Sequence, residues 1–139
     1  MSSEETFYLA GCIITDDQKR VLLLHRNTDK RVQWEIPGGK IEPNEDARAT
    51  AARELKEELD IDVEVRDLLG DKHFLEEGRT MHYSWFAAHI VGGQPRITEP
   101  HIHDKLAYMS IDEMKTLHHD LSPNGRNFLE AVTRGDIRL

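Results

Sequence analysis

Apolar and polar positions alternate along the chain in blocks that predict a series of strands. Apolar, β-branched runs over 7–15 and 20–25 are separated by the polar stretch 16–19, which is typical of a hairpin buried on both faces. A long aromatic-rich run over 80–90 predicts a central strand. Shorter extended segments are predicted at 62–65, 68–75 and 105–109.

A helical pattern follows Asn44 and continues to about residue 59. Asn44 is the predicted N-cap, acidic residues follow it, and strong helix formers fill the remainder. At 100° per residue, the apolar residues around Leu55 fall on one side and are predicted to pack inward. Ser110 begins a capping-box sequence for a short helix, and Ser122-Pro123 opens a final helix.

The order of these elements points to a mixed sheet flanked by helices, although the pattern alone leaves several topologies open. The length of 139 residues predicts one domain, 1–139, with a core of its own. We find no internal repeat, linker or low-complexity tract that would divide it.

Composition and charge narrow the class of protein. Apolar residues make up 38% and charged residues 32%, which suits a globular domain with a generous polar surface. The net charge of −8 argues against binding bulk DNA or RNA through phosphate neutralisation. No membrane span or secretory signal is visible, so a cytoplasmic protein is expected. Cys12 lies in an apolar run and is predicted to be a buried, inert thiol, and a homodimer is left open.

Candidate chemistry is concentrated on the long helix. Glu54, Glu57 and Glu58 are spaced i, i+3, i+4, so their carboxylates share one face and repel one another. A divalent cation removes this conflict, and Mg²⁺ prefers oxygen ligands. The alternative is an ordinary solvated helix, since such runs of Glu and Lys are common. The preceding Gly38-Gly39 pair favours a metal site, because glycines allow close backbone approach.

The spacing resembles the Nudix box of the Nudix hydrolase superfamily, and eight of its nine fixed positions match. The exception is Asp60, where the family usually has Gly in a left-handed conformation that Asp tolerates at some cost. The matching residues are Gly39, Glu45, Arg53, Glu54, Leu55, Glu57, Glu58 and Ile61.

The resemblance implies a fold and a metal site. The fold would be α/β (α+β), a Nudix-type α/β/α sandwich with a mixed central sheet. The metal would be Mg²⁺, with Mn²⁺ able to substitute, and its implied ligands are Glu54, Glu57, Glu58, the Gly38 carbonyl and Glu99.

Catalytic roles are predicted for the three helix carboxylates and for Arg53. We expect Arg53 to orient the carboxylates through charge-assisted hydrogen bonds, and Glu54 to activate the attacking water. Glu45 is predicted to assist in the same way or to favour the helix N-terminus.

Four residues are predicted to bind substrate. Arg26 and Lys40 resemble the phosphate-facing cations of MutT-type Nudix enzymes, and Asn124 resembles the Asn that reads a purine edge in that type. An amide suits a base edge because it presents both a donor and an acceptor. Alternation places Tyr83 and Trp85 on one face of their strand, where Tyr83 could stack on a base. His101 and His103, by contrast, are expected to be solvated loop residues, because two histidines alone are a weak metal signal.

The resemblance predicts a small-molecule nucleotide as substrate. The first hypothesis is a MutT-like (d)NTP pyrophosphohydrolase, with oxidised purine nucleotides among its candidate substrates, giving a nucleoside monophosphate and pyrophosphate. The alternatives are an ADP-ribose or dinucleoside polyphosphate pyrophosphatase and, in another class, a non-catalytic nucleotide-binding module. An RNA-cap hydrolase is disfavoured by the acidic charge.

Overall fold

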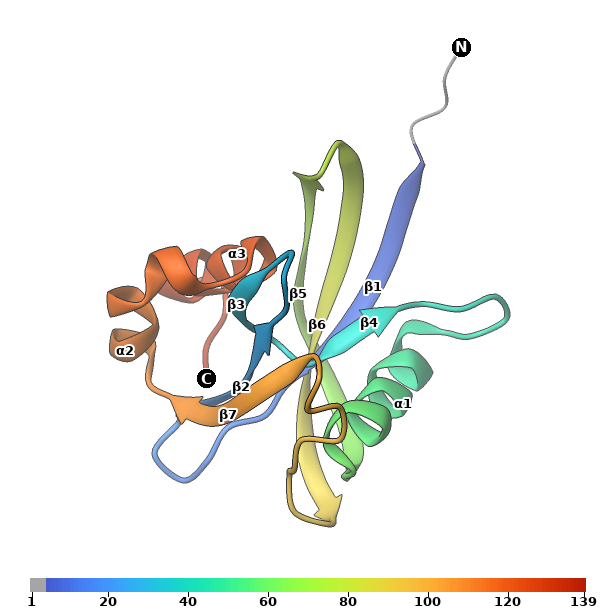
Figure 1. Ribbon diagram of the computed structural model, residues 1–139, viewed down its shortest axis with the longest axis vertical. Coiled ribbons are helices and arrows are strands. Elements are labelled where there is room, and N and C mark those ends of the chain that lie inside the picture. The colour runs from blue at the N-terminus through green and yellow to red at the C-terminus, as the bar shows by residue number, and fades with distance from the viewer. Residues whose placement is uncertain (1–4) are drawn as a thin grey trace.

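A computed structural model describes residues 5–139, and in this range it contains two β-sheets and three α-helices (Figure 1). The first four residues of the predicted domain, 1–139, lie outside the described range. The elements are β1 (Thr6–Ile13), β2 (Val21–Asn27), β3 (Val32–Glu35), β4 (Gly38–Lys40), α1 (Ala47–Leu59), β5 (Asp62–Glu76), β6 (Arg79–Gly92), β7 (His103–Met109), α2 (Ile111–Thr116), the 3₁₀ turn η1 (His118–Asp120) and α3 (Pro123–Thr133).

The larger sheet has four strands in the order β4-β1-β6-β5 and is mixed, as predicted. β1 runs parallel to β6 and antiparallel to β4, while β5 and β6 form a long antiparallel hairpin that turns at Glu77-Gly78. The predicted central strand at 80–90 is β6, which lies between β1 and β5. The smaller sheet, β3-β2-β7, is antiparallel.

The prediction of a simple hairpin over 7–15 and 20–25 is wrong, because β1 and β2 belong to different sheets. Where the chain reverses, their backbones are joined by a bridge between Thr15 and Val21 and by a 2.9 Å bond from the Leu22 N–H to the Ile14 carbonyl. Both edges of β1 are already paired, with β4 and β6, so β2 diverges and finds its partners in the second sheet. The second run is buried over 21–25, as predicted, but the first is buried only over 10–14, since Tyr8 is 54% exposed.

Two core clusters occupy opposite faces of the larger sheet, which confirms the sandwich. On one face α1 contributes Leu55 and Leu59, and on the other α3 contributes Phe128, which meets Trp85 edge-on with ring centroids 5.7 Å apart. Cys12 is fully buried in the first cluster, and burial raises the pKa of its thiol to about 12, as expected of an inert thiol.

Helix α1 begins two residues later than predicted. Its N-cap is Asp46, whose side chain accepts a 2.8 Å hydrogen bond from the Ala49 N–H. Asn44 instead adopts a left-handed turn conformation with φ 66°. At the other end Asp60 is left-handed, with φ 55° and ψ 41°, as predicted for the position where the box usually has Gly. Its carboxylate is held by the Arg96 Nε–H at 2.9 Å.

The remaining helix starts agree with the sequence pattern. Ser110 and Glu113 form both hydrogen bonds of a capping box at the start of α2. Ser122 caps α3, and Pro123 occupies the first turn. Among residues 5–139, none of the helices combines the length and apolar character needed to cross a bilayer.

Candidate active site

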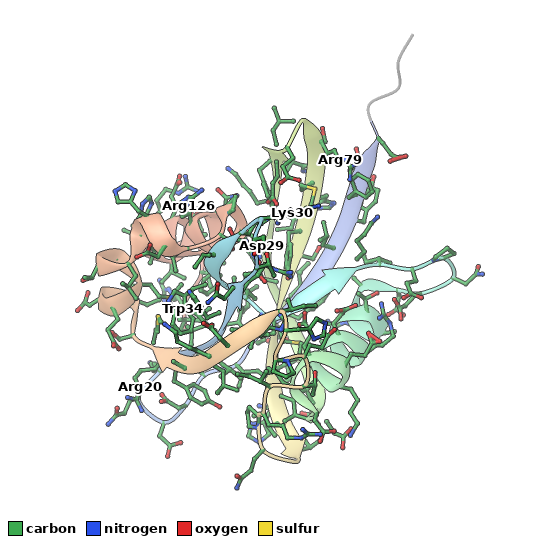
Figure 2. The ribbon with its side chains drawn as sticks, in the orientation of Figure 1. Arg20, Asp29, Lys30, Trp34, Arg79 and Arg126 are labelled. Atoms are coloured by element: carbon green, nitrogen blue, oxygen red, sulfur yellow. The ribbon has the colours of Figure 1, made fainter. Side chains whose placement is uncertain are left out.

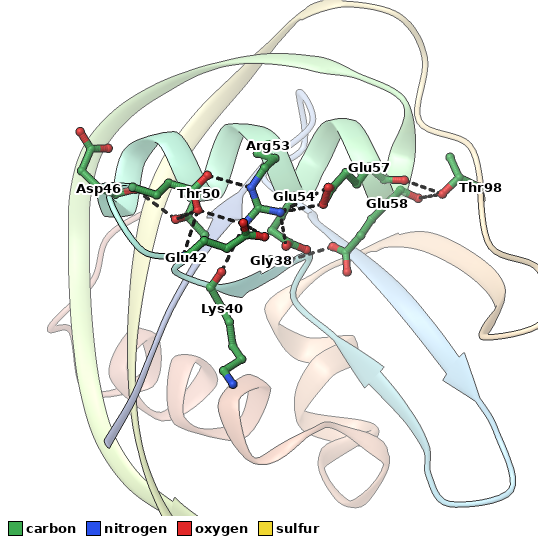
Figure 3. Close-up of polar contacts among 11 residues, drawn as sticks. Gly38, Lys40, Glu42, Asp46, Thr50, Arg53, Glu54, Glu57, Glu58 and Thr98 are labelled. Atoms are coloured by element: carbon green, nitrogen blue, oxygen red, sulfur yellow. Dashed lines mark hydrogen bonds and ion pairs between the residues drawn. The ribbon is translucent and has the colours of Figure 1, made fainter. Parts of the chain in front are cut away.

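Arg53 is the centre of a network of carboxylates on and beside α1 (Figure 3). Its Nε–H and one Nη–H donate to the two carboxylate oxygens of Glu45, at 2.8 and 3.0 Å. The other Nη donates to Glu54 at 2.9 Å and to Glu57 at 2.7 Å. A further donation reaches the Lys40 carbonyl at 3.2 Å, which ties the helix to β4. The predicted charge-assisted bonds from Arg53 are therefore present.

Glu45 is the firmest partner of Arg53. The bonds from Arg53 and from the Thr50 hydroxyl, at 2.6 Å, lower the pKa of Glu45 to about 2. The bidentate contact with Glu45 in turn raises the pKa of the Arg53 guanidinium. Glu45 lies before the helix, outside its first turn, so its structural role is to hold Arg53 rather than to complement the helix dipole.

Glu54 is packed against the backbone of β4. A Cβ built on Gly39 would lie 2.5 Å from the carboxyl carbon of Glu54, so only glycine leaves room for this carboxylate. Its side chain is 17% exposed. Burial, followed by the charge of Glu57, raises the pKa of Glu54, and the charge of Arg53 partly offsets this rise.

Glu58 lies one turn further along the same side of α1, and its carboxylate accepts a 2.9 Å hydrogen bond from the Gly38 N–H (Figure 3). Burial and the nearby charge of Glu54 raise the pKa of Glu58 well above its usual range. Glu54 and Glu58 therefore repel each other, and a bound cation would relieve this repulsion.

The donor set fits a hard divalent cation in kind, since its members are carboxylates that repel one another. Within residues 5–139, no three His, Cys, Asp or Glu side chains converge closely enough to hold a metal ion. Glu54 and Glu57 turn toward Arg53, while Glu58 turns toward the Gly38 N–H. Metal binding would therefore require these side chains to rotate toward a common point.

Glu99 is carried by the loop between β6 and β7. The preceding residue, Thr98, donates its hydroxyl to the carbonyls of Glu57 and Glu58, at 2.6 and 3.1 Å. These bonds satisfy carbonyls at the C-terminal end of α1 and fasten the loop beside the acidic helix (Figure 3). The Thr98 side chain thus holds the Glu99 loop at the end of α1 that carries the acid cluster, Glu54, Glu57 and Glu58.

A cavity of about 270 Å³ adjoins the acid cluster, and all four predicted substrate-binding residues line it. Gly38 and Gly39 form the part of its wall that also contacts Glu58 and Glu54. The full lining is Leu9, Arg26, Arg31, Gln33, Glu35, Ile36, Gly38, Gly39, Lys40, Phe74, Glu76, Met81, Tyr83, Ser122 and Asn124.

The cationic members of this lining have different partners. The Arg26 Nε–H donates to Glu35 at 2.9 Å across β2 and β3. The side chain of Lys40 points away from the acid cluster, with its Nζ 4.0 Å from the ring centroid of Phe7 (Figure 3). At the far wall, Asn124 accepts a 2.9 Å bond from the Trp85 Nε1–H.

Tyr83 lies deeper than a stacking platform would. It is 6% exposed and belongs to the core cluster with Trp85, on the face that alternation predicts. A Cβ added to Gly11 or Gly38 would collide with its hydroxyl, so β1 and β4 pass closely over this ring. Tyr83 therefore forms the floor of the cavity, and burial raises the pKa of its hydroxyl.

The expectation of solvated histidines fails for His103. It begins β7, is 2% exposed, and pairs in register with Arg26. Neither ring nitrogen has a hydrogen-bond partner within the described part of the chain. Burial, followed by the charge of Arg26, lowers its pKa. The expectation was wrong because it placed His103 in a loop, whereas β7 carries it into the molecule; His101 is exposed, as expected.

Comparison with known proteins identifies the family. The model of the NUDIX domain matches residues 7–132. The chain belongs to the Nudix family. A Mycobacterium tuberculosis H37Rv protein named "Putative 8-oxo-dGTP diphosphatase 2" is 31% identical over 91% of this chain and 86% of its own. The CTP pyrophosphohydrolase of Escherichia coli K12 is 32% identical over 88% of each chain.

The fold agrees with this assignment. The crystal structure of a MutT NUDIX hydrolase from Burkholderia pseudomallei has a TM-score of 0.80 and 30% identity, covering 91% of this chain and 98% of that chain. The protein is thus a Nudix pyrophosphohydrolase, an enzyme that acts on phosphoanhydride bonds, with MutT-like relatives.

Sequence reasoning on this Nudix domain missed three supporting groups. Thr50 and Thr98 use their hydroxyls to fix Glu45 and the Glu99 loop, and Glu35 holds Arg26. Thr50 lies one helical turn after the N-cap, and this spacing could have indicated its contact with Glu45. Thr98 and Glu35 act through contacts between separate elements, which spacing along the chain does not show.

Proposed function

We propose that this Nudix protein is a Mg²⁺-dependent nucleoside triphosphate pyrophosphohydrolase that releases a nucleoside monophosphate and pyrophosphate. The observation that supports it most is the shared wall of the site, because Gly38 and Gly39 contact the acid cluster on one side and line the cavity on the other. A nucleotide whose base occupies the cavity would have its phosphates at the carboxylates. The names of the relatives, an 8-oxo-dGTP diphosphatase and a CTP pyrophosphohydrolase, support a triphosphate.

The acid cluster would hold the metal. Glu54, Glu57 and Glu58 supply carboxylates, and the Gly38 carbonyl and Glu99 complete the proposed ligand set. When bound, Mg²⁺ neutralises charge on the phosphate oxygens and aligns them for in-line displacement.

The chain's own residues would direct the reaction. Glu54 accepts the proton of a water whose oxygen attacks one phosphorus, and the phosphoanhydride P–O bond on the opposite side breaks. Burial raises the pKa of Glu54, which makes its carboxylate a better base than a solvated one. Arg53 fixes the orientation of the carboxylates from behind. Arg26 contacts the phosphates, Lys40 would reach them by swinging away from Phe7, and Asn124 contacts the base above Tyr83.

A nucleotide panel tests the substrate class. With Mg²⁺ we expect the canonical and oxidised dNTPs to be hydrolysed faster than ADP-ribose or a dinucleoside tetraphosphate, with equal amounts of monophosphate and pyrophosphate formed. Performing the reaction in ¹⁸O-labelled water shows which product carries the new oxygen, and hence which phosphorus is attacked. Faster turnover of ADP-ribose than of any triphosphate would overturn the proposal.

The same assay tests the acid cluster. Glu57→Gln is expected to lower kcat by at least ~10²-fold, comparable to removing a strong electrostatic catalyst, while circular dichroism shows an intact fold. Glu64→Gln is the matched control, since Glu64 is an exposed glutamate on β5 whose ion pair within residues 5–139 is with Arg66. If Glu57→Gln and Glu64→Gln had the same kcat, the proposed catalytic role of the acid cluster would be rejected.

A further inference from the structure

A second cavity, of about 370 Å³, is lined by the last three helical segments, α2, η1 and α3. It has no lining residue in common with the cavity beside the acid cluster. Lys115 of α2 and His118 of η1 form one wall, and five residues of α3 form the other. We call this cavity the α2–α3 groove. Its volume is that of a small-molecule site.

The wall contributed by α3 is a single stripe along the helix. Arg126, Leu129, Glu130, Thr133 and Arg134 are spaced i, i+3, i+4, i+7 and i+8, so they share one face. At 1.5 Å per residue this stripe is about 12 Å long. A groove of that length admits about four residues of an extended chain. It therefore suits a small molecule better than a peptide segment.

One end of the stripe is electrically balanced. Arg134 donates to Glu130 at 2.7 Å and contacts Asp136 at 3.1 Å, so carboxylates already match its charge. An added anion would gain little at this end of the groove.

The other end carries cations that lack a close carboxylate. Arg126, labelled on α3 in Figure 2, donates one Nη–H to the Leu121 carbonyl at 2.7 Å and forms no ion pair within the described residues. Lys115 lies 3.9 Å from Asp112, whose side chain is 95% exposed, so solvent screens this contact. Only residues 117–122 connect α2 to α3, and Lys115, His118 and Arg126 all line the same cavity.

These groups match the oxygens of an anion. A guanidinium presents five N–H donors in a planar fork, and the Leu121 carbonyl occupies only one Nη of Arg126, so further donors are left for a ligand. The His118 imidazole offers another N–H. Leu129, which is 4% exposed, supplies an apolar floor in the same cavity. Because the whole chain has a net charge of −8, an anion is attracted to it only where cations gather in this way.

We propose that the α2–α3 groove binds a small organic anion, whose phosphate or carboxylate group is held by Arg126, Lys115 and His118 while its apolar part lies against Leu129. The site is separate from the proposed hydrolysis, because none of its lining residues lines the cavity beside the acid cluster. It would still be found if the substrate assignment failed.

Backbone amide shifts in ¹H–¹⁵N spectra test the proposal with three probes: phenyl phosphate, benzoate and the uncharged benzyl alcohol. The titrations are performed in EDTA, so that no metal-bound anion contributes. We expect one or both anions to give saturable shifts in residues 115–134, and the tighter of the two identifies the anionic group that the groove prefers. Benzyl alcohol should bind at least about 10-fold more weakly, because it cannot form charge-assisted hydrogen bonds.

Arg126→Gln removes the charge but keeps an amide donor, and it should weaken binding of the anions by about 10-fold or more. Arg96→Gln is the matched control, since Arg96 is an exposed arginine that pairs with Asp60 beside α1, and its affinity for the probes should equal that of the wild type. If Arg126→Gln does not fold, Lys115→Glu reverses the charge of an exposed side chain and should give the same loss.

Binding of neither anion would overturn the proposal, and so would shifts confined to residues outside the groove. Equal affinity for benzyl alcohol and the anions would show an apolar groove without anion recognition. An Arg126→Gln protein, or Lys115→Glu in its place, that binds the anions as tightly as the wild type would also reject the site.

Discussion

A single arginine organises the negative charge of this active site. Arg53 is bonded to Glu45, Glu54 and Glu57 at once, which the planar guanidinium with its five donors allows and an ammonium does not. Two of its bonds go to Glu45, which has no proposed contact with metal or substrate. Arg53 is thus anchored on one side and holds the working carboxylates on the other.

Arg53→Lys tests this arrangement. We expect kcat/KM to fall by about 10–100-fold, chiefly through weaker apparent Mg²⁺ affinity, because groups that orient metal ligands have effects of this size. A titration of activity with Mg²⁺ separates a loss of Mg²⁺ affinity from a loss of activity at saturating Mg²⁺. Arg134→Lys is the control, since Arg134 makes exposed contacts with Glu130 and Asp136 on and after α3 and should leave the titration unchanged. Superimposable Mg²⁺ curves for all three proteins would contradict the role of Arg53.

Residues that act through their own helix were predictable from the sequence, and residues that act across elements were not. The spacing of Glu54 and Glu58 places them on one face whatever the rest of the fold does. His103 was misjudged because its burial depends on β2 and β7 pairing, which joins parts of the chain almost eighty residues apart. The Thr98 anchor likewise depends on the β6–β7 loop returning to α1.

At the scale of elements, the site depends on how closely β1 and β4 approach each other. Gly11 pairs with Gly38 across the two strands, and both lie over the Tyr83 hydroxyl. A Cβ on Gly11 would also come within 2.5 Å of the Pro37 carbonyl oxygen, which is backbone and cannot rotate away. The glycines therefore allow β4 to be positioned between the core and the acidic helix.

Gly11→Ala is expected to destabilise the fold by about 1–3 kcal/mol, the usual effect of overpacking a well-filled core. Gly70→Ala on β5 provides the comparison, because its added methyl would meet Ile137 at an ordinary 3.5 Å. We expect Gly70→Ala to be neutral or slightly stabilising, since glycine in a strand is unfavourable. Urea denaturation measures both, and equal midpoints would show that β1 and β4 can separate without penalty.

The elements themselves were largely predictable, while their partners were not. Strand β6, the capping box of α2 and the Ser122-Pro123 start of α3 follow from local patterns. The hairpin prediction failed because a short polar turn between two apolar runs is compatible with a chain that passes from one sheet to another. The start of α1 was misplaced because Asn44 and Asp46 are both good caps, and only tertiary contacts choose between them.

At the scale of the whole molecule, helix α1 (Figure 1), which carries the acid cluster, packs against strands of both sheets. Glu58 reaches Gly38 at the edge of the larger sheet, while Arg26 and Glu35 belong to the smaller one. The parallel pairing of β1 with β6 has no local signal in the sequence. This architecture was therefore predictable only through the resemblance to the family. Because ligands of the proposed metal come from several elements, metal binding and global stability should be linked.

Mg²⁺ is therefore expected to raise the thermal unfolding midpoint of the wild type relative to EDTA at matched ionic strength. A ligand that binds only the folded state at 100 times its Kd adds about 2.7 kcal/mol, or roughly 5–10 °C for a domain of this size. In EDTA, Glu58→Gln should unfold at a higher temperature than the wild type, because burial and Glu54 both oppose the charge that the variant removes. The same variant should lose most of the Mg²⁺ response, whereas Glu64→Gln should retain it. A full Mg²⁺ response in Glu58→Gln would mean that the cation binds elsewhere, and the stabilisation would then carry no information about the acid cluster.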